Sequence, residues 1–352
     1  MIGGSTAAGS CDGNAKNEDA SGPPFISVVI PVYNEAEHIS ETLQALLGQS
    51  YPADRFELLV ADGGSTDETR DIVGKIAARD DRVRLLDNPG RRSSSGRNAG
   101  FRAARGEIAM VVDGHVSIES ERLLESVGRC FHDSGADCLG RPQPLVPVPG
   151  NDWSRAICHA RGSFLGHSTS SYIYGSSEGF VPAASHGAAY KKHVFERVGY
   201  VDESFDACED LEFNTRIDAA GLSCYTSPDL TVRYFARTGL RALFRQMHRY
   251  GFGRYKYRRR HPRHASPTEL VPAALVAYAV LWPATLLAGA RAAAVAAAPL
   301  LLYALLVAAV TLALSIRHDL KLAWRLALVF PVIHAGLGAG YIESILRGGR
   351  MR

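Results

Sequence analysis

Two clusters of polar residues follow apolar runs near the start of the chain. Pro31-Val32-Tyr33-Asn34-Glu35 ends the run at 25–33, and Asp62 comes directly after the run at 56–61. A carboxylate in such a place can accept a hydrogen bond from a base N–H or from a ribose hydroxyl, although Asn and Asp also simply cap loops there. Two such ends on neighbouring strands favour a site that binds a nucleoside.

Two further clusters have residue types that suit phosphates. Asp113-Gly114-His115 ends the apolar run at 108–112, and its carboxylate and imidazole point to one side, which suits Mg²⁺ or Mn²⁺ that bridges nucleotide phosphates. Gly96-Arg97-Asn98-Ala99-Gly100 enters a predicted helix, where backbone N–H groups and an Arg suit a diphosphate. Taken singly, the first cluster could also be a turn at a strand end, and the second a Gly-rich helix start.

Glu209 and Asp210 open a predicted helix directly after Asp206-Ala207-Cys208. Acidic residues in this position often do no more than complement the helix dipole. A carboxylate here can also act as a general base that takes a proton from an acceptor hydroxyl. Side chains at adjacent helix positions point about 100° apart, so only one of the two carboxylates can face that hydroxyl.

A basic amphipathic helix is expected around Gln246-Met247-His248-Arg249-Tyr250. Its arginines repeat every four residues and its opposite face is apolar: Arg237, Arg241, Arg245 and Arg249 against Leu240, Leu243, Phe244 and Met247. Because a hydrophobic tail follows, this pattern is typical of a helix at a membrane interface. A nucleic-acid surface is the alternative, but the chain has no RNA- or DNA-binding motif, so we expect no nucleic-acid partner.

An α/β domain must position these clusters. Short apolar, β-branched runs predict strands at 25–33, 56–61, 83–86 and 108–112. Intervening helices at 36–47 and 95–104 make this an alternating pattern, which favours an open, Rossmann-like sheet of parallel strands. Ligands of such sheets bind outside the carboxyl ends of the strands, where the clusters lie. Further along, the pattern predicts a long connection at 141–182 and helices at 188–198, 211–219 and 238–250.

The distribution of charge and hydrophobicity predicts a membrane protein. The net charge is only +3, yet residues 233–264 carry eleven Lys or Arg and no Asp or Glu. Two uncharged runs at 270–290 and 292–314 exceed the ~20 residues that cross a bilayer, which excludes an ordinary soluble protein and general disorder. A third run at 326–342 is shorter, contains His334, and could span the membrane or lie at its interface.

Arginines just before the first apolar run indicate the orientation: Arg258, Arg259, Arg260 and Arg263. The positive-inside rule places that side in the cytoplasm, and six cysteines without CxxC pairs or zinc spacing suit a reducing compartment. We therefore expect a multi-pass protein of the cell (inner) membrane with a cytoplasmic catalytic domain. The expected regions are a disordered leader at 1–24, the α/β domain at 25–236, a basic interfacial helix and collar at 237–264, two to three transmembrane helices at 265–346 and a tail at 347–352.

The order of these pieces resembles the family 2 glycosyltransferases, which have the GT-A fold. The likeness is carried by VVIPVYNE (28–35), VADGGSTDET (60–69), GRNAGFRAARGE (96–107), VVDGH (111–115), GAAYKKHVFERVGYVDESF (187–205), ED (209–210) and QMHRY (246–250). Three features look most like glycosyltransferases of succinoglycan and other exopolysaccharide synthesis: the VDGH form, the RRRHP that follows QMHRY, and the C-terminal spans. The resemblance implies a nucleotide-sugar donor, usually a UDP-sugar, and inversion at the anomeric carbon.

The resemblance also implies roles for individual residues. Those expected to hold the donor are Pro31, Tyr33, Glu35, Asp62, Arg97, Asn98, Asp113, Gln246 and Arg249. Asp113 and His115 would bind Mn²⁺ or Mg²⁺, Asp210 would be the base, and Glu209 would bond to nearby backbone or to the acceptor.

This chain departs from the family pattern in two places. His115 stands at the second Asp of the DxD motif, and Tyr250 stands at the Trp of QxxRW. His186 and His248 are candidates for a third metal ligand, and Asp113 alone with water could instead hold Mg²⁺.

The resulting hypothesis is an inverting glycosyltransferase that moves a sugar to a hydroxyl of a lipid-linked glycan or polysaccharide precursor at the cytoplasmic face of the membrane. A polyprenyl-phosphate glycosyltransferase is the alternative, but its acceptor phosphate needs no strong base. A processive synthase would need more spans. An inactive membrane-tethered scaffold would tolerate the loss of Asp113 and Asp210, which are both present. An oxidoreductase would need a GxGxxG motif after the first strand, where PVYNEAEH stands instead.

Overall fold

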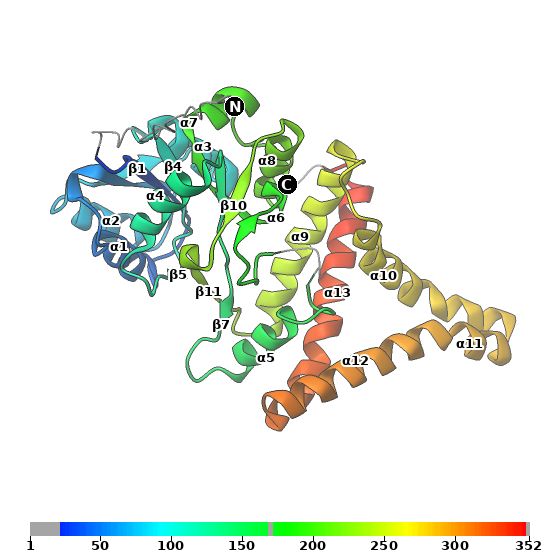
Figure 1. Ribbon diagram of the computed structural model, residues 1–352. Coiled ribbons are helices and arrows are strands. Elements are labelled where there is room, and N and C mark those ends of the chain that lie inside the picture. The colour runs from blue at the N-terminus through cyan, green and yellow to red at the C-terminus, as the bar shows by residue number, and fades with distance from the viewer. Residues whose placement is uncertain (1–21, 168–171, 350–352) are drawn as a thin grey trace, which may run out of the picture.

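The computed structural model of the chain describes residues 22–167 and 172–349 (Figure 1). The leader expected at 1–24 therefore lies almost wholly outside the described residues, as does the end of the expected tail. Within the described ranges, an α/β domain is followed by a group of long helices.

The elements follow one another in alternation through the first half of the chain. The strands are β1 (Ile26–Val32), β2 (Phe56–Asp62), β3 (Val83–Asp87), β4 (Ile108–Val111), β5 (Val116–Ser117), β6 (Cys138–Gly140), β7 (Leu145–Val146), β8 (Gly179–Phe180), β9 (Gly187–Lys191), β10 (Cys224–Thr226) and β11 (Arg233–Phe235). The α-helices are α1 (Ile39–Leu47), α2 (Thr69–Ala77), α3 (Ser93–Ala103), α4 (Leu123–Ser134), α5 (Asp152–Arg161), α6 (Ala183–His186), α7 (Lys192–Val198), α8 (Glu209–Ala219), α9 (Leu240–Arg260), α10 (Val271–Leu281), α11 (Ala290–Ala296), α12 (Ala298–Arg317) and α13 (Ala323–Leu346).

An eight-stranded sheet forms the centre of the domain, in the order β3-β2-β1-β4-β9-β6-β10-β8. The first four strands pair in parallel, which confirms the expectation for this part. Beyond β4 the sheet is mixed, because β9 is antiparallel to both β4 and β6. A second, three-stranded sheet, β5-β11-β7, begins just after the loop that follows β4.

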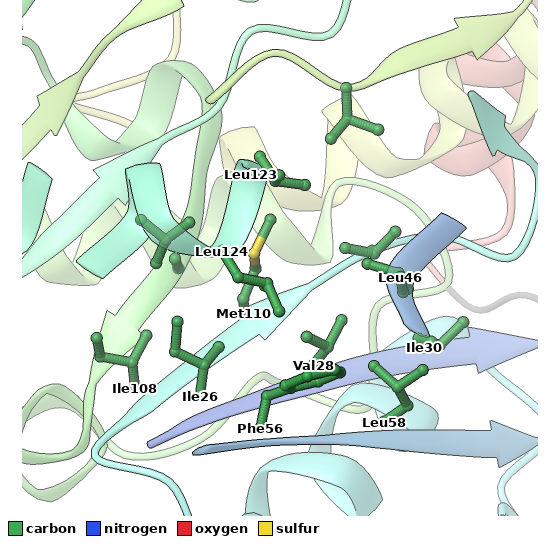
Figure 2. Close-up of a cluster of buried hydrophobic side chains, with 14 of the residues drawn as sticks. Ile26, Val28, Ile30, Leu46, Phe56, Leu58, Ile108, Met110, Leu123 and Leu124 are labelled. Carbon is green, nitrogen blue, oxygen red and sulfur yellow. The ribbon is translucent and has the colours of Figure 1, made fainter. Parts of the chain in front are cut away.

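Buried side chains cover both faces of the sheet. Successive residues of a strand point to opposite faces, so Val28 and Ile30 join one cluster while Val29 joins the other. Figure 2 shows the first cluster, in which Leu46 from α1 and Leu124 from α4 lie over β1, β2 and β4. This core holds the strand ends, and with them the polar loops, in fixed positions.

The helix expected at 188–198 is only half correct. Residues 187–191 form β9, and the helix α7 begins at Lys192. Tyr190 is buried between neighbouring strands, facing Ala109 of β4 and Cys138 of β6. Pairing on both sides therefore overrides the local helical preference of this segment.

The long connection expected at 141–182 contains regular structure that its sequence does not reveal. α5 begins after Asn151, whose side chain accepts a hydrogen bond from the Ser154 backbone N–H at 2.8 Å. Ile157 and Ala160 of this helix are buried in a cluster shared with α9 and α13. The helix is short and bounded by Gly and Pro, which hides its period.

Three apolar stretches after α9 are long enough to cross a membrane by length and composition: Pro267–Ala288, Ala298–Arg317 and Leu320–Leu346. The first two correspond to the runs expected at 270–290 and 292–314. In Figure 1, α10, α11 and α12 extend away from the α/β domain, whereas α13 lies along α9. The third run, left open by the sequence, therefore lies in a 24-residue helix.

Glycines bring α13 into close contact with α9. A Cβ added to Gly340 would lie 2.0 Å from the backbone oxygen of His248, and one added to Gly336 would lie 2.7 Å from Met247 Cβ. Small residues four apart are the usual means of close packing between membrane helices. α9 also continues to Arg260 rather than ending near 250, and it packs against α13.

Candidate active site

Asp113 lies just beyond the carboxyl end of β4, where the Rossmann-like pattern places ligands. The hydroxyl of Tyr234 donates a hydrogen bond to it. Burial alone would raise the pKa of Asp113, but Arg97, His115 and Arg141 outweigh burial and hold the pKa below its usual value. Asp113 is therefore an ionised carboxylate surrounded by cations.

His115 is oriented by a second carboxylate. Its Nδ1 lies 2.9 Å from Glu35 Oε1, and although burial lowers the pKa of His115, this bond and the Glu35 charge raise it overall. A histidine that ligates a metal through one nitrogen commonly donates its other N–H to a carboxylate in this way. The arrangement thus suits a metal ligand, and it gives Glu35 a position beside His115 that the sequence did not suggest.

The donor set around Asp113 and His115 fits a metal that also binds phosphate. Within 22–167 and 172–349, no group of three or more His, Cys, Asp or Glu could hold a metal by itself. Mg²⁺ and its analogues need few protein ligands when substrate phosphates and water supply the rest. Of the two candidates for a third ligand, His248 pairs through Nε2 with Glu343 Oε2 at 2.7 Å. His186 Nε2 bonds Thr226 Oγ1 at 3.0 Å, while its Nδ1 is buried without a partner among the described residues.

Arg97 of α3 lies between Asp113 and the Glu209–Asp210 pair. Its Nη2 is 3.5 Å from Glu209 Oε1. Burial acts to lower the pKa of Arg97, but Glu209, Asp210 and Asp113 raise it. Its Nε is buried and has no hydrogen-bond partner among the described residues, so one donor of this guanidinium remains available for an anionic ligand.

The neighbouring carboxylates at the start of α8 have different surroundings. Glu209 is 6% exposed, and burial together with Asp210 raises its pKa against the opposing charge of Arg97. Asp210 is exposed, and its Oδ1 accepts a hydrogen bond from the Leu211 backbone N–H at 2.8 Å. Only Asp210 therefore has a carboxylate free to meet a hydroxyl from outside.

Gln246 and Arg249, the two residues of α9 expected to hold the donor, lie beside the loop before α8. Arg249 donates to the Asp206 backbone oxygen at 2.9 Å, and its Nε is 3.5 Å from Asp206 Oδ2. Gln246 Nε2 lies 3.3 Å from the Tyr250 hydroxyl. Arg249 thus ties α9 to the segment that carries Asp210.

The loops expected to hold the nucleoside are bonded to each other. Asp62 is buried and accepts from Arg70 Nη1 at 3.1 Å and from Ser65 Oγ at 2.5 Å. Asn34 Oδ1 accepts from the Thr66 backbone N–H at 2.8 Å. These bonds order the two loops around Asp62.

Three more residues from the expected donor set have distinct positions. Pro31 is half-buried near the start of α3, where a Cβ on Gly96 would lie 3.1 Å from its own. Tyr33 follows β1 directly and is 53% exposed. The Asn98 amide is buried and bonded to the Val201 backbone N–H and oxygen at 3.0 and 2.9 Å. Asn98 therefore fixes the 201–203 loop, and we leave it out of the proposed donor site.

Arg141 belongs to the site but was missed in the sequence. It follows β6 directly, is 3% exposed, and donates to the Tyr234 hydroxyl at 2.9 Å. Its Nε and Nη1 have no partner among the described residues. Had a strand been predicted at 138–140, Arg141 would have been recognised as a residue at its carboxyl end. The three residues of β6 are too few to show a period.

Comparisons with known proteins identify the family of the chain. Residues 27–199 match glycosyl transferase family 2, and residues 143–316 match glycosyl transferase family group 2. The succinoglycan biosynthesis protein ExoA of Rhizobium meliloti (strain 1021) is 32% identical over 234 residues, which are 65% of this chain and 68% of that protein.

Two more distant similarities extend this result. The dolichyl N-acetyl-alpha-D-glucosaminyl phosphate 3-beta-D-2,3-diacetamido-2,3-dideoxy-beta-D-glucuronosyltransferase of Methanococcus voltae is 25% identical over 232 residues, 64% of this chain and 72% of that one. Among solved structures, the mannosyltransferase PcManGT from Pyrobaculum calidifontis has a TM-score of 0.61 at 21% identity and covers 92% of this chain and 88% of its own. At that identity the likeness concerns the fold.

Proposed function

The chain belongs to glycosyl transferase family 2 and has the GT-A fold, and from this premise we propose that it is an inverting enzyme. It moves a sugar from a nucleotide-sugar, a UDP-sugar in the first instance, to a hydroxyl of a lipid-linked glycan or polysaccharide precursor. The reaction takes place at the cytoplasmic face of the cell (inner) membrane.

The position of Arg97 is the observation that carries the proposal. This guanidinium lies near Asp113 at one end and near Glu209 and Asp210 at the other, and its Nε is unpartnered. A donor diphosphate bound there would leave its sugar between the metal-binding end and the exposed carboxylate of Asp210. An acceptor hydroxyl and a leaving phosphate would thus meet on opposite faces of one sugar carbon.

The protein's own groups then account for the steps of the transfer. Arg97 and Arg141 bind the diphosphate and stabilise the charge that gathers on it as it leaves. Asp210 takes the proton of the acceptor hydroxyl during attack. Attack from the opposite face in a single displacement inverts the anomeric carbon. A divalent ion held by Asp113 and His115 would further neutralise the diphosphate charge.

The relatives support both the donor class and the acceptor class. PcManGT was solved in complex with GDP-Man and Mn²⁺, which supports a nucleotide-sugar with a divalent metal and makes GDP-sugars the second donor to test. The two curated relatives are named for succinoglycan biosynthesis and for transfer to a dolichyl-phosphate-linked sugar. Both names describe products that are assembled on a carrier or as a polysaccharide.

The C-terminal helices support a carrier that lies in the membrane. Three stretches are apolar and long enough to span, and the cluster of arginines at 258–260 and 263 supports a cytoplasmic position for the adjoining α/β domain. Exposed Arg241 and Arg245 on α9 would meet anionic lipids. The α/β region at 25–236 would thus be held over the leaflet that contains the acceptor.

A panel of UDP- and GDP-sugars tests the proposal. Membranes that contain the protein are assayed for nucleotide release with and without a lipid extract that supplies acceptors, and Asp113→Ala serves as the inactive control. We expect release with one donor, increased by the extract and abolished in Asp113→Ala. No release above the control with any donor would contradict the proposal. Transfer to polyprenyl phosphate that persists in Asp210→Asn would instead favour a polyprenyl-phosphate glycosyltransferase.

A further inference from the structure

Arg161 is a buried cation outside the group around Asp113. It is the last residue of α5 and is 8% exposed. Its Nη2 donates to the Tyr174 hydroxyl at 3.1 Å, and its Nη1 lies 3.5 Å from Met247 Sδ. Its Nε is buried without a hydrogen-bond partner, and it forms no ion pair with a carboxylate in the part of the chain that the structure describes. A buried guanidinium with only a phenol and a thioether as partners is stabilised when an anion binds.

An apolar cavity adjoins this guanidinium. It has a volume of about 130 Å³. Its lining consists of Pro144, Leu145, Cys158, Gly162 and Tyr174. Tyr174 is thus shared between the cavity wall and the Arg161 hydrogen bond. The Arg161 guanidinium is therefore linked through Tyr174 to a cavity whose apolar lining favours hydrocarbon.

α5 connects this place to the membrane helices. Trp153 packs edge-to-face on Trp324 of α13 with ring centroids 5.1 Å apart, and Asp152 pairs with Arg325 at 3.1 Å. The loop after α5 is also attached, because the Leu165 backbone oxygen lies 3.0 Å from His334 Nε2. α5 and the loop after it are thus in contact with α13, one of the candidate spans.

The side chain of Tyr250 lies near both Arg161 and Asp210, the proposed base. Tyr250 is 38% exposed, and the groups whose charges act on its side chain include Arg161, Tyr174 and Asp210. Arg161 and Asp210 thus lie near one aromatic side chain of α9, whereas Arg97 and Arg141 act on Asp113. The donor diphosphate already has two guanidiniums of its own, so Arg161 is available to the acceptor.

We propose that Arg161 binds the phosphate of a lipid-linked acceptor and that the adjoining cavity takes the first part of its hydrocarbon chain. The inference rests on the proposed function, because it assigns a subsite to the acceptor of that reaction. A planar guanidinium suits phosphate oxygens through paired hydrogen bonds. The cavity selects a phosphate that carries an apolar chain over a free phosphate or a nucleotide.

Binding of geranylgeranyl diphosphate to the full chain in lipid nanodiscs tests the proposal without any need for sugar transfer. Radiolabelled probe is displaced by geranylgeraniol, inorganic diphosphate or unlabelled probe, and UDP or GDP binding with Mn²⁺ is measured in parallel. We expect Arg161→Gln to weaken probe binding at least tenfold and Arg161→Lys to weaken it less, with nucleotide binding unchanged. Cys158→Phe, which narrows the cavity, should weaken the probe without changing the affinity for inorganic diphosphate. Arg155→Gln is the matched control on α5, since its guanidinium already pairs with Asp152 and Asp319.

Each alternative has its own outcome. Probe binding that is unchanged in Arg161→Gln, or that falls together with nucleotide binding, would overturn the proposal. Inorganic diphosphate that competes as well as the probe, with no effect of Cys158→Phe, would show a site for free phosphate and would also overturn it. If Arg161→Gln does not fold, Cys158→Phe alone decides between these results. Probe binding that depends on Arg161 in a protein that transfers no sugar would refute the proposed function and leave this subsite intact.

Discussion

The sharpest prediction concerns the two adjacent carboxylates at the start of α8. Asp210→Asn should remove catalysis and leave stability unchanged, whereas Glu209→Gln should reduce stability and affect catalysis less. Asn keeps the Oδ1 that accepts from the Leu211 backbone N–H at 2.8 Å, but it cannot take a proton. Because Asp210 is exposed, its substitution should change the free energy of unfolding by less than about 0.5 kcal/mol.

The magnitudes follow from the surroundings of each residue. Loss of a general base lowers kcat by about 10²–10⁴, or roughly 3–5 kcal/mol of barrier. The Glu209 and Arg97 side chains are 8% and 14% exposed and lie 3.5 Å apart. Gln keeps an acceptor oxygen but not the charge, and Asp113 and Asp210 still face Arg97. Burial and Asp210 also raise the pKa of Glu209, so the fold disfavours the charge that Gln removes. We therefore expect Glu209→Gln to cost no more than about 1 kcal/mol of stability, the usual size for a single substitution.

Two measurements on the same preparations separate these effects. Nucleotide release at saturating donor gives kcat, and the unfolding temperature of the full chain in detergent gives stability. Asp71→Asn, an exposed carboxylate on α2, is the matched control and should change neither. Near wild-type transfer by Asp210→Asn with an inactive but stable Glu209→Gln would show that the roles are reversed. Full activity in both variants would show that the pair only caps the helix, and the mechanism would fail.

Other regions give further predictions. Burial lowers the pKa of His186 to about 4, so between pH 6.5 and 4 the unfolded chain binds a proton that the folded chain does not, and stability falls as the pH falls. His186→Gln should remove about 3 kcal/mol of this loss, measured as a flatter dependence of the unfolding temperature on pH. Gly340→Val should lower the unfolding temperature, because its Cβ would meet a backbone oxygen of α9 at 2.0 Å, whereas Gly74→Ala, whose Cβ meets nothing within 4 Å, should not. Glu35→Ala should raise the Mn²⁺ concentration for half-maximal activity by about 10–100-fold, because it removes the acceptor that orients the His115 ring; an unchanged Mn²⁺ titration would contradict that role. Carbonate or high salt should leave the protein in the membrane pellet, and its release would contradict spanning helices.

The sequence predicted the parts of the fold whose signals are local. β1, β2 and β4 are buried, mainly apolar strands and β3 is a half-buried edge strand, and each was found within a residue or two of its observed bounds. The segments that failed depend on partners far away in the chain. β9 is a strand because β4 and β6 lie on either side of it, and no pattern within residues 187–191 reports those neighbours.

The same distinction applies to the site. Asp113, His115, Glu209 and Asp210 lie at element ends that the sequence reveals, and the structure brings Arg97 to both pairs. Side-chain partners could not be predicted, because they depend on how loops meet. Asn98 is an example, since its amide bonds the backbone of Val201 instead of facing a ligand. Arg141 and Arg161 are the converse: Arg141 follows the three-residue β6 and Arg161 is the last residue of α5, and neither element has a readable period.

The expected boundary at 264/265, between the basic helix and the membrane segments, separates two helices that pack as one unit. α13 is attached to α9 by the His248–Glu343 pair at 2.7 Å and by the close approach of Gly340 to the His248 backbone. α9 in turn carries Gln246 and Arg249, and Arg249 bonds the loop that leads into α8. A displacement of α13 would therefore move α9, and through the Arg249–Asp206 hydrogen bond it would move the loop that precedes Asp210. The last apolar segment is thus both a candidate span and a support of the helix that leads to Asp210, the proposed base, and its glycines lie at the faces that meet α9 and α10.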